Sequence, residues 1–187
     1  ELDMTLNLIT PLFRSGMLSR IKDSIPKHED INWIIILCAH REILIKECIG
    51  LQLPFLVINA EDTFSSIHLK TNLGIRNMKE GFFYGLDDDT TFNHNCYEVF
   101  KKYGKDYKMI IGEQILQDGS IRPAQKPQHC YTDGGQALIH SSLLNNIGIG
   151  DLSRNPVADC DLLLDCYNST ENRIFVNEVI SNYNFLR

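Results

Sequence analysis

Short apolar runs bounded by turn residues alternate with helix-like stretches along the first half of the chain. This alternation is typical of an α/β sheet whose strands are mostly parallel. We therefore predict an α/β fold with a mixed, mainly parallel central sheet flanked by helices. The predicted strands are Leu6–Thr10, Ile31–Cys38, Phe55–Asn59 and Gly81–Leu86.

Helix-like segments separate these strands, and each one stops at a residue that ends helices. Pro26 cannot continue a helix, and Gly50 and Gly81 suit the backbone that follows one. The predicted helices are Met17–Ile25, Arg41–Ile49 and Asn72–Lys79, with a further one beginning near His94.

The pattern changes after residue 107. Met109–Leu116 and the Asp-Gly pair at 118–119 predict a β-hairpin with its turn at that pair. Further helices are predicted over Gln136–Asn145 and Asp159–Tyr167. No repeat, low-complexity tract or linker interrupts the chain, so we expect a single domain.

Composition narrows the possible functions. Of the 187 residues, 43% are hydrophobic and 22% charged, which suits a globular domain and excludes disorder, collagen and coiled coil. Eighteen Lys and Arg against 24 Asp and Glu give a net charge of −6, which argues against nucleic-acid binding. The six cysteines lack zinc-ligand spacing and are expected to be reduced packing residues. With no membrane span or secretory signal readable, we expect a cytoplasmic protein.

The most informative stretch is an aromatic strand that ends in three acids, Asp87, Asp88 and Asp89. If the backbone stays extended, Asp87 and Asp89 point to one face and Asp88 to the other. Two carboxylates would then converge at the carboxyl end of a buried strand, where α/β sheets bind ligands. Such oxygen ligands suit Mg²⁺ or Mn²⁺. The alternative is a solvated acidic turn that caps the following helix.

One phosphatase family shares this pattern. The residues Asp87, Asp89 and Thr91 resemble the first motif of haloacid dehalogenase-type phosphatases, in which the first Asp is the nucleophile. In that family the motif usually lies on the first strand of the core, whereas three predicted strands precede it here. A Mg²⁺-dependent phosphatase with Asp87 as nucleophile is therefore kept as an alternative.

The chain more closely resembles a GT-A glycosyltransferase, the class that uses nucleotide sugars and carries a DxD motif. The matching segments follow the family's order over nearly the whole chain. They are Leu8–Arg14 for the opening strand and turn, Trp33–Ile36 for the second strand, Asn72–Asn77 for the next helix, Gly81–Asp89 for the DxD strand, and Ala158–Leu162 for the Glu-Asp-x-Asp-Leu segment.

The resemblance implies roles for individual residues. A Mn²⁺ or Mg²⁺ ion would be held by Asp89 and Asp87 against the departing diphosphate, and Asp88 would contact the ribose. The other residues expected to border the nucleotide-diphosphate-sugar donor are Thr10, Pro11, Arg14, Arg76, Gly134, Gly135 and Gln136. Within a single domain of residues 1–187, residues 1–107 would form the nucleotide-binding half and residues 108–187 the acceptor and catalytic half.

The resemblance also implies a catalytic base. Asp159 aligns with that role and Asp161 is the fallback, although either residue could instead cap the helix that follows. With Asp159 as base the reaction inverts configuration; without it, a retaining mechanism becomes plausible. The acceptor would be a hydroxyl group of a glycan or protein-linked glycan.

Two departures from the family keep other readings open. Many relatives carry an Asp after the second strand that holds the base of the nucleotide, but Cys38 to Arg41 stand here instead. A UDP-sugar is still favoured as donor, although this position does not support it. Ala158 replaces the usual Glu beside the candidate base. A non-catalytic nucleotide-sugar-binding module therefore stays as a third hypothesis.

Overall fold

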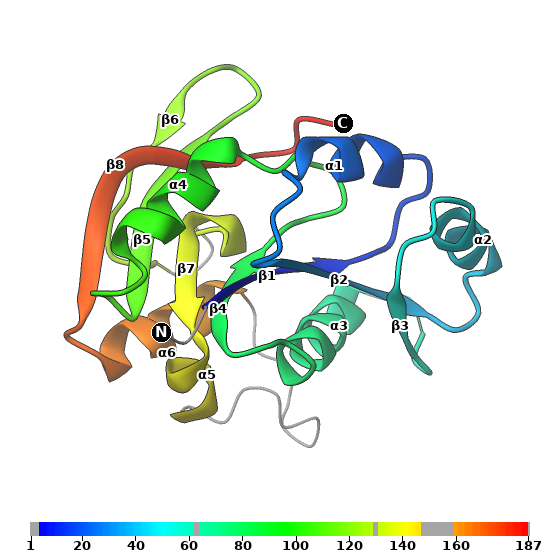
Figure 1. Ribbon diagram of the computed structural model, residues 1–187, viewed down its shortest axis with the longest axis horizontal. Coiled ribbons are helices and arrows are strands. Elements are labelled where there is room, and N and C mark those ends of the chain that lie inside the picture. The colour runs from blue at the N-terminus through cyan, green and yellow to red at the C-terminus, as the bar shows by residue number, and fades with distance from the viewer. Residues whose placement is uncertain (1–3, 62–63, 129–130, 147–158, 187) are drawn as a thin grey trace.

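A computed structural model describes residues 4–61, 64–128, 131–146 and 159–186, which form a single α/β domain (Figure 1). The described strands make one eight-stranded sheet in the order β3-β2-β1-β4-β7-β5-β6, with β8 paired to β5. The predicted fold class is confirmed.

The first half of the chain supplies the parallel part of this sheet. β1 lies between β2 and β4, and β2 also pairs with β3. All four predicted strands are present, with ends that differ by one residue at most. Their bounds are Thr5–Pro11 for β1, Ile31–Cys38 for β2, Phe55–Ile58 for β3 and Gly81–Gly85 for β4.

The helices between these strands also follow the predicted order. The bounds are Leu18–Ser24 for α1, Glu42–Gly50 for α2, Phe64–Arg76 for α3 and His94–Tyr103 for α4. The helix before β4 was predicted from Asn72 but begins at Phe64, because its first turns carry polar residues that hide the helical periodicity.

The second half is mixed. The predicted hairpin is confirmed as β5 (Met109–Ile115) and β6 (Ile121–Arg122). The remaining elements are the 3₁₀ turn η1 (Gly134–Gln136), β7 (Ala137–His140), α5 (Ser141–Asn146), α6 (Asp159–Ser169) and β8 (Arg173–Asn182). The helix predicted over Gln136–Asn145 is wrong in its first part, because Ala137–His140 is a buried strand between β4 and β5.

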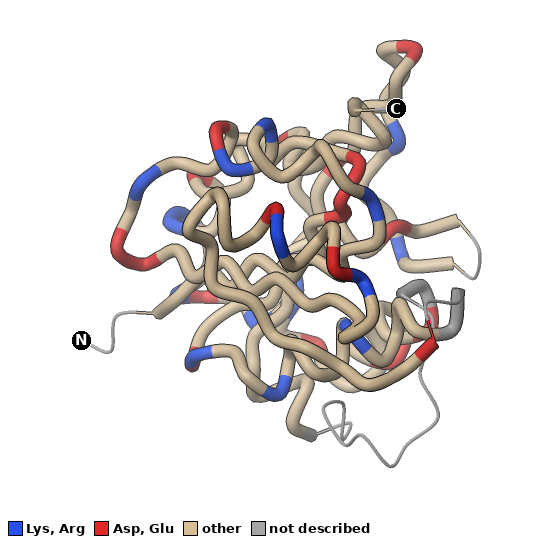
Figure 2. The backbone as a smooth tube through the Cα atoms, turned by 90° about the vertical axis from the view of Figure 1, so that its right-hand side faces the viewer, with Lys and Arg blue, Asp and Glu red and all other residues tan. Residues whose placement is uncertain are grey.

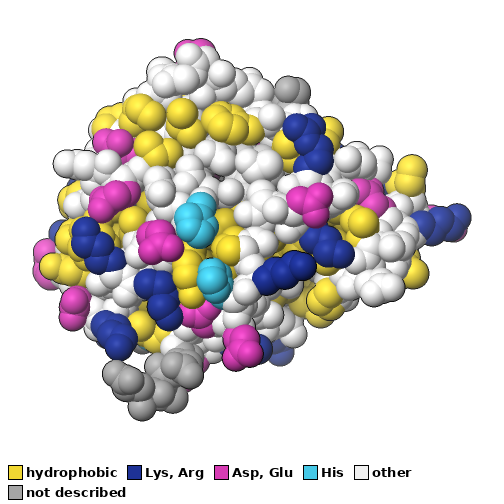
Figure 3. Space-filling model, turned by 45° about the horizontal axis from the view of Figure 1, so that its top comes forward, with side chains coloured by type: hydrophobic (Ala, Val, Ile, Leu, Met, Phe, Trp, Pro, Cys, Tyr) yellow, Lys and Arg dark blue, Asp and Glu magenta, His cyan; other side chains and the backbone are white. Residues whose placement is uncertain are grey.

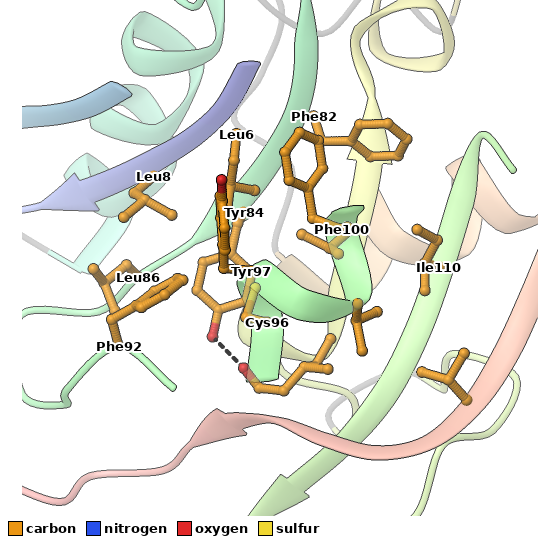
Figure 4. Close-up of a cluster of buried hydrophobic side chains, with 14 of the residues drawn as sticks. Leu6, Leu8, Phe82, Tyr84, Leu86, Phe92, Cys96, Tyr97, Phe100 and Ile110 are labelled. Carbon is orange, nitrogen blue, oxygen red and sulfur yellow. Dashed lines mark hydrogen bonds between the residues drawn. The ribbon is translucent and has the colours of Figure 1, made fainter. Parts of the chain in front are cut away.

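Helices cover both faces of the sheet. Side chains of α1, α2 and α4 pack on one face, and those of α3, α5 and α6 on the other. An aromatic core, drawn in Figure 4, anchors β4 against α4: the rings of Phe82 and Phe100 lie 5.7 Å apart. The Tyr84 hydroxyl donates to the carbonyl of Ile180 at 3.1 Å and so ties β4 to β8. The strand that leads into the three acids is therefore rigidly held.

The carboxyl ends of β1, β4, β5 and β8 meet at one edge of the sheet, because these strands run in the same direction. Leu86 N–H donates to the carbonyl of Ile9 at 3.0 Å, and Leu186 N–H to that of Asp89 at 2.9 Å. Figure 1 shows the β5–β6 hairpin and the C-terminus on this side of the sheet and α5 on the other.

Within the described residues, no helix has both the length and the apolar character needed to cross a bilayer.

Candidate functional site

The acidic turn does not continue the extended path of β4. The strand ends at Gly85, and the chain turns at Asp88 and Asp89. Both of these carboxylates reach Arg14, and Asp87 lines a narrow pocket beside the turn. The extended backbone on which the shared face of Asp87 and Asp89 depended is therefore absent, and their joint role as metal ligands stays a prediction.

Asp88 fastens the loop that follows β1. Its side chain is 2% exposed and accepts hydrogen bonds from the backbone N–H of Phe13 at 2.6 Å and of Arg14 at 2.8 Å. The Arg14 guanidinium donates to its other oxygen. Both oxygens of Asp88 thus have donors within the protein, and its predicted contact with ribose stays a prediction.

Two further cations hold the same loop. Lys70, a fully buried residue of α3, donates to the carbonyl of Leu12 at 2.8 Å, and its Nζ lies 3.2 Å from the centre of the Phe13 ring. Arg41 Nη2 donates to the carbonyl of Phe13 at 2.8 Å. The loop is therefore fixed by contacts from three parts of the chain. Sequence reasoning missed Lys70 because nothing in its local pattern marks it as buried.

Asp89 joins the turn to the C-terminal segment. Its carboxylate is buried, 3.3 Å from Arg14 Nη1, and the Asn184 side-chain amide, assigned with its nitrogen toward the carboxylate on hydrogen-bonding grounds, lies 3.1 Å from it. Thr90 Oγ1 donates to the carbonyl of Asn182 at 2.7 Å. Asp89, the first choice for a direct metal ligand, is therefore surrounded by donors from two other segments.

The pocket beside the turn brings several elements together. Asp87 is half-buried in its wall and faces groups from β1, α3, β4, η1 and α6. The lining residues are Ile9, Pro11, Thr71, Phe83, Gly85, Asp87, Gly134, Leu162 and Leu163. The free volume here is about 10 Å³, room for about one water molecule, so the cavity marks where these elements meet and is too small for a nucleotide.

The predicted glycine turn borders this pocket through Gly134. Asp133 caps the turn by accepting from Gly135 N–H at 2.9 Å, and the buried Gln136 side chain completes the capping box. A Cβ on Gly135 would lie 2.5 Å from Ser181 Oγ, so the backbone approach requires glycine there. Gln136 is thus engaged in the turn itself.

The other predicted donor-binding residues are divided between the two edges of the sheet. Pro11 lines the pocket with Asp87, whereas the buried Thr10 hydroxyl accepts from the Trp33 indole at 2.9 Å. Arg76 ends α3 and lines a different cavity at the amino end of β4. The structure therefore does not bring Arg76 to the acidic turn, because the helix carries it to the opposite edge.

The candidate bases lie at the start of α6, whose Leu162 and Leu163 reach the pocket. Asp159 begins this helix, and its side chain lies outside the described residues. Asp161 is half-buried and acts on His68 of α3. Burial lowers the pKa of His68, and the negative charge of Asp161 offsets part of that lowering. His68 is a neighbour of the site that sequence reasoning missed.

Among the described residues, no group of three or more His, Cys, Asp or Glu side chains is placed to hold a metal ion. Charges of both signs are interspersed along the chain and over the face seen in space-filling view (Figures 2 and 3). That face carries no broad basic field of the kind that grips a nucleic-acid backbone.

Two half-buried histidines predict a pH dependence of stability. Burial lowers the pKa of His68, and burial together with Lys108 lowers that of His140. In the unfolded chain the histidine pKa is about 6.5. As the pH falls through that value, the unfolded chain therefore binds more protons than the folded one. The midpoint temperature of thermal unfolding, followed by circular dichroism, should therefore fall as the pH is lowered from about 7.5 to about 5.5.

The variants His140→Gln and His94→Gln test this expectation. His140 Nδ1 accepts from Ser142 N–H at 3.2 Å, which requires an unprotonated nitrogen, whereas His94 is exposed. The first substitution should flatten the fall in the unfolding midpoint, and the second should leave it unchanged. Equal slopes in all three proteins would contradict the assignment.

Neither a protein-family description nor a curated protein sequence matches this chain.

Several solved structures are similar in fold. Residues 1–349 of S. aureus TarS superpose with a TM-score of 0.69 at 14% identity, covering 94% of this chain and 58% of that one. The complex of the same protein with UDP-GlcNAc gives a TM-score of 0.68 at 14% identity, covering 94% and 56%. The 4-diphosphocytidyl-2C-methyl-D-erythritol synthase of Anaerococcus prevotii gives 0.62 at 13% identity, covering 94% and 87%.

These likenesses show a GT-A-like fold. The chain spans less than two thirds of the TarS fragment but most of the synthase. The role of the acidic turn as a DxD motif stays a prediction, and Ala158 of the last matching segment lies outside the described residues.

Proposed function

We propose that this chain is a nucleotide-sugar glycosyltransferase domain that moves a sugar from a nucleoside diphosphate to a hydroxyl acceptor. The observation that carries this proposal is the joining of the acidic turn to the loop after β1, at the edge where α/β sheets bind ligands. The fold likeness to TarS, whose structures include complexes with UDP-GlcNAc and with UDP, supports it.

In the proposed reaction, the bond between the anomeric carbon and the diphosphate oxygen breaks while the acceptor oxygen forms its bond to the same carbon. The acceptor proton passes to a carboxylate at the start of α6, with Asp159 as first candidate and Asp161 as second. The nucleoside diphosphate leaves with the bonding electrons. Pro11, Asp87 and Gly134 would border the donor, because they lie together at the carboxyl edge of the sheet.

Asp87 and Asp89 would hold a Mn²⁺ or Mg²⁺ ion, whose preferred ligands are carboxylate, phosphate and water oxygens. Such an ion, when bound, stabilises the negative charge that develops on the leaving diphosphate. Asp89 now faces Arg14 at 3.3 Å, so that carboxylate would be shared between the guanidinium and the ion. Asp87, which lines the pocket, would be the second ligand, through water or a neighbouring donor.

Nucleotidyl transfer is a second candidate, favoured by the 87% coverage of the A. prevotii synthase. Such an enzyme would join a nucleoside triphosphate to a sugar or polyol phosphate and release pyrophosphate. The phosphatase alternative is less well supported, because the acidic turn follows β4 and not the first strand.

A thermal-shift panel tests the proposal. The chain is heated with UDP-GlcNAc, UDP, CTP and GDP, each with and without Mn²⁺. A ligand at about a hundredfold excess over its Kd stabilises a protein by about 2.7 kcal/mol, which raises the midpoint by about 5 to 11 °C at this size. We expect that rise for UDP-GlcNAc and UDP, and only with Mn²⁺.

The same panel distinguishes the alternatives. A rise with CTP alone, followed by pyrophosphate release on addition of a sugar phosphate, would overturn the glycosyltransferase proposal in favour of nucleotidyl transfer. Hydrolysis of p-nitrophenyl phosphate without any nucleotide binding would favour the phosphatase. Donor binding without transfer or slow donor hydrolysis would indicate a non-catalytic module.

A further inference from the structure

Two tyrosine rings flank one arginine at the edge of the sheet where the acidic turn lies. The guanidinium carbon of Arg122, on β6, lies 5.3 Å from the centre of the Tyr131 ring and 5.2 Å from that of Tyr183. Aromatic faces attract a cation at such distances. The two rings come from segments far apart in the sequence, so this arrangement depends on the folded edge of the sheet.

A buried glutamine fixes the guanidinium relative to the pocket. Arg122 Nη1 donates to Gln114 Oε1 at 2.6 Å, and Gln114 is fully buried. The same amide donates to Asp133 Oδ1 at 3.0 Å and to Ser181 Oγ at 2.9 Å. Asp133 in turn caps the turn whose Gly134 lines the pocket. One continuous network thus connects Arg122 with the wall that contains Asp87.

The charge of Arg122 is not neutralised within the described part of the chain. The ion pairs found there include Arg14 with Asp88 and Arg173 with Glu171, but none with Arg122. Its neighbours are two neutral rings and a neutral amide. A guanidinium that is held in place without a carboxylate partner can bind an anionic group through two parallel hydrogen bonds.

The cluster of Arg122 and the two rings is open to solvent at Tyr131. Tyr131 is 46% exposed, and Arg122 and Tyr183 are half-buried. Exposed aromatic rings offer flat surfaces on which the apolar face of a sugar ring can stack. The cluster therefore combines a stacking surface with one fixed positive charge.

We propose that Arg122, Tyr131 and Tyr183 form the acceptor subsite and select a sugar that carries a phosphate or carboxylate. Calling the ligand an acceptor rests on the proposed function, whereas the preference for an anionic sugar rests on the unpaired charge and the rings alone. The sugar ring stacks on Tyr131, and its anionic group binds the Arg122 guanidinium.

Three probes with the same hexose ring test this proposal: methyl glucoside, glucose 6-phosphate and glucuronate. Their affinities for the whole chain are measured by calorimetry, with and without UDP and Mn²⁺. We expect at least one anionic probe to bind about tenfold or more tightly than the neutral one, with a preference that weakens as salt is added. The tighter of the two anions identifies phosphate or carboxylate as the group recognised.

Variants assign the effect to residues. Arg122→Gln should abolish the preference for the anionic probes, Arg122→Lys should retain part of it, and Tyr131→Ala should weaken all three probes. Arg20→Gln, which removes an exposed arginine of α1, is the matched control and should change nothing. Circular dichroism of each variant reports whether it is folded.

Equal binding of neutral and anionic probes by the unmodified chain would overturn the proposal, as would a preference that survives in a folded Arg122→Gln protein. Donor binding is read separately from the UDP-GlcNAc thermal shift. An Arg122-dependent preference without donor binding would sustain the anionic-sugar site and overturn the transferase assignment. Donor binding without the preference would overturn the anionic-sugar site and sustain the transferase assignment.

Discussion

Replacing Asp88 by alanine is expected to destabilise the protein by about 3 kcal/mol, because a buried carboxylate that holds three donors is lost. The backbone N–H groups of Phe13 and Arg14 lose their acceptor, and the Arg14 guanidinium loses its closest partner. Urea unfolding followed by circular dichroism measures the change in free energy of unfolding.

Two further variants define what Asp88 contributes. Asp88→Asn keeps an oxygen acceptor for the backbone but removes the charge facing Arg14, so a smaller loss is expected. Asp106→Ala removes an exposed carboxylate and should stay within about 0.5 kcal/mol of the parent. If Asp88→Ala were as stable as Asp106→Ala, the loop after β1 would not depend on the acidic turn.

The fold could be predicted where local patterns are strong. The apolar run Ile31–Cys38 has the bounds of the observed β2, since a buried parallel strand needs no alternation. The sequence predicts a helix where β7 lies, because Ala137–His140 is too short to show a period. Its pairing with β4 and β5 decides that it is a strand. β8 was not predicted at all, since its pairing with β5 is a long-range contact.

The site could be predicted only as far as its residue types. The three acids were found, but their directions depend on the turn at Asp88, which no spacing rule supplies. Lys70 and Arg122 are ordinary basic residues in the sequence and acquire their roles from burial and from rings brought by distant segments. Arg76 was assigned by similarity of sequence order, and the direction of α3 places it at the other edge.

Replacing Asp87 by asparagine is expected to lower the rate of sugar transfer by about a thousandfold or more, because the carboxylate that we propose to act at the departing diphosphate loses its charge. The fold should persist, since Asp87 is half-buried and asparagine has nearly the same shape. The measurement is the initial rate of UDP release from UDP-GlcNAc with Mn²⁺, compared with Asp106→Asn as the matched control.

The Asp87→Asn result also tests how the two neighbouring acids differ. Asp88 is occupied by backbone donors and Asp89 faces Arg14, so neither can replace the lost charge in the pocket without breaking contacts that hold the loop. The Mn²⁺-dependent part of the UDP-GlcNAc thermal shift should therefore disappear together with the activity. A variant that keeps both would contradict a metal role for Asp87 and leave the acidic turn as a structural connection between the loop after β1 and the C-terminal segment.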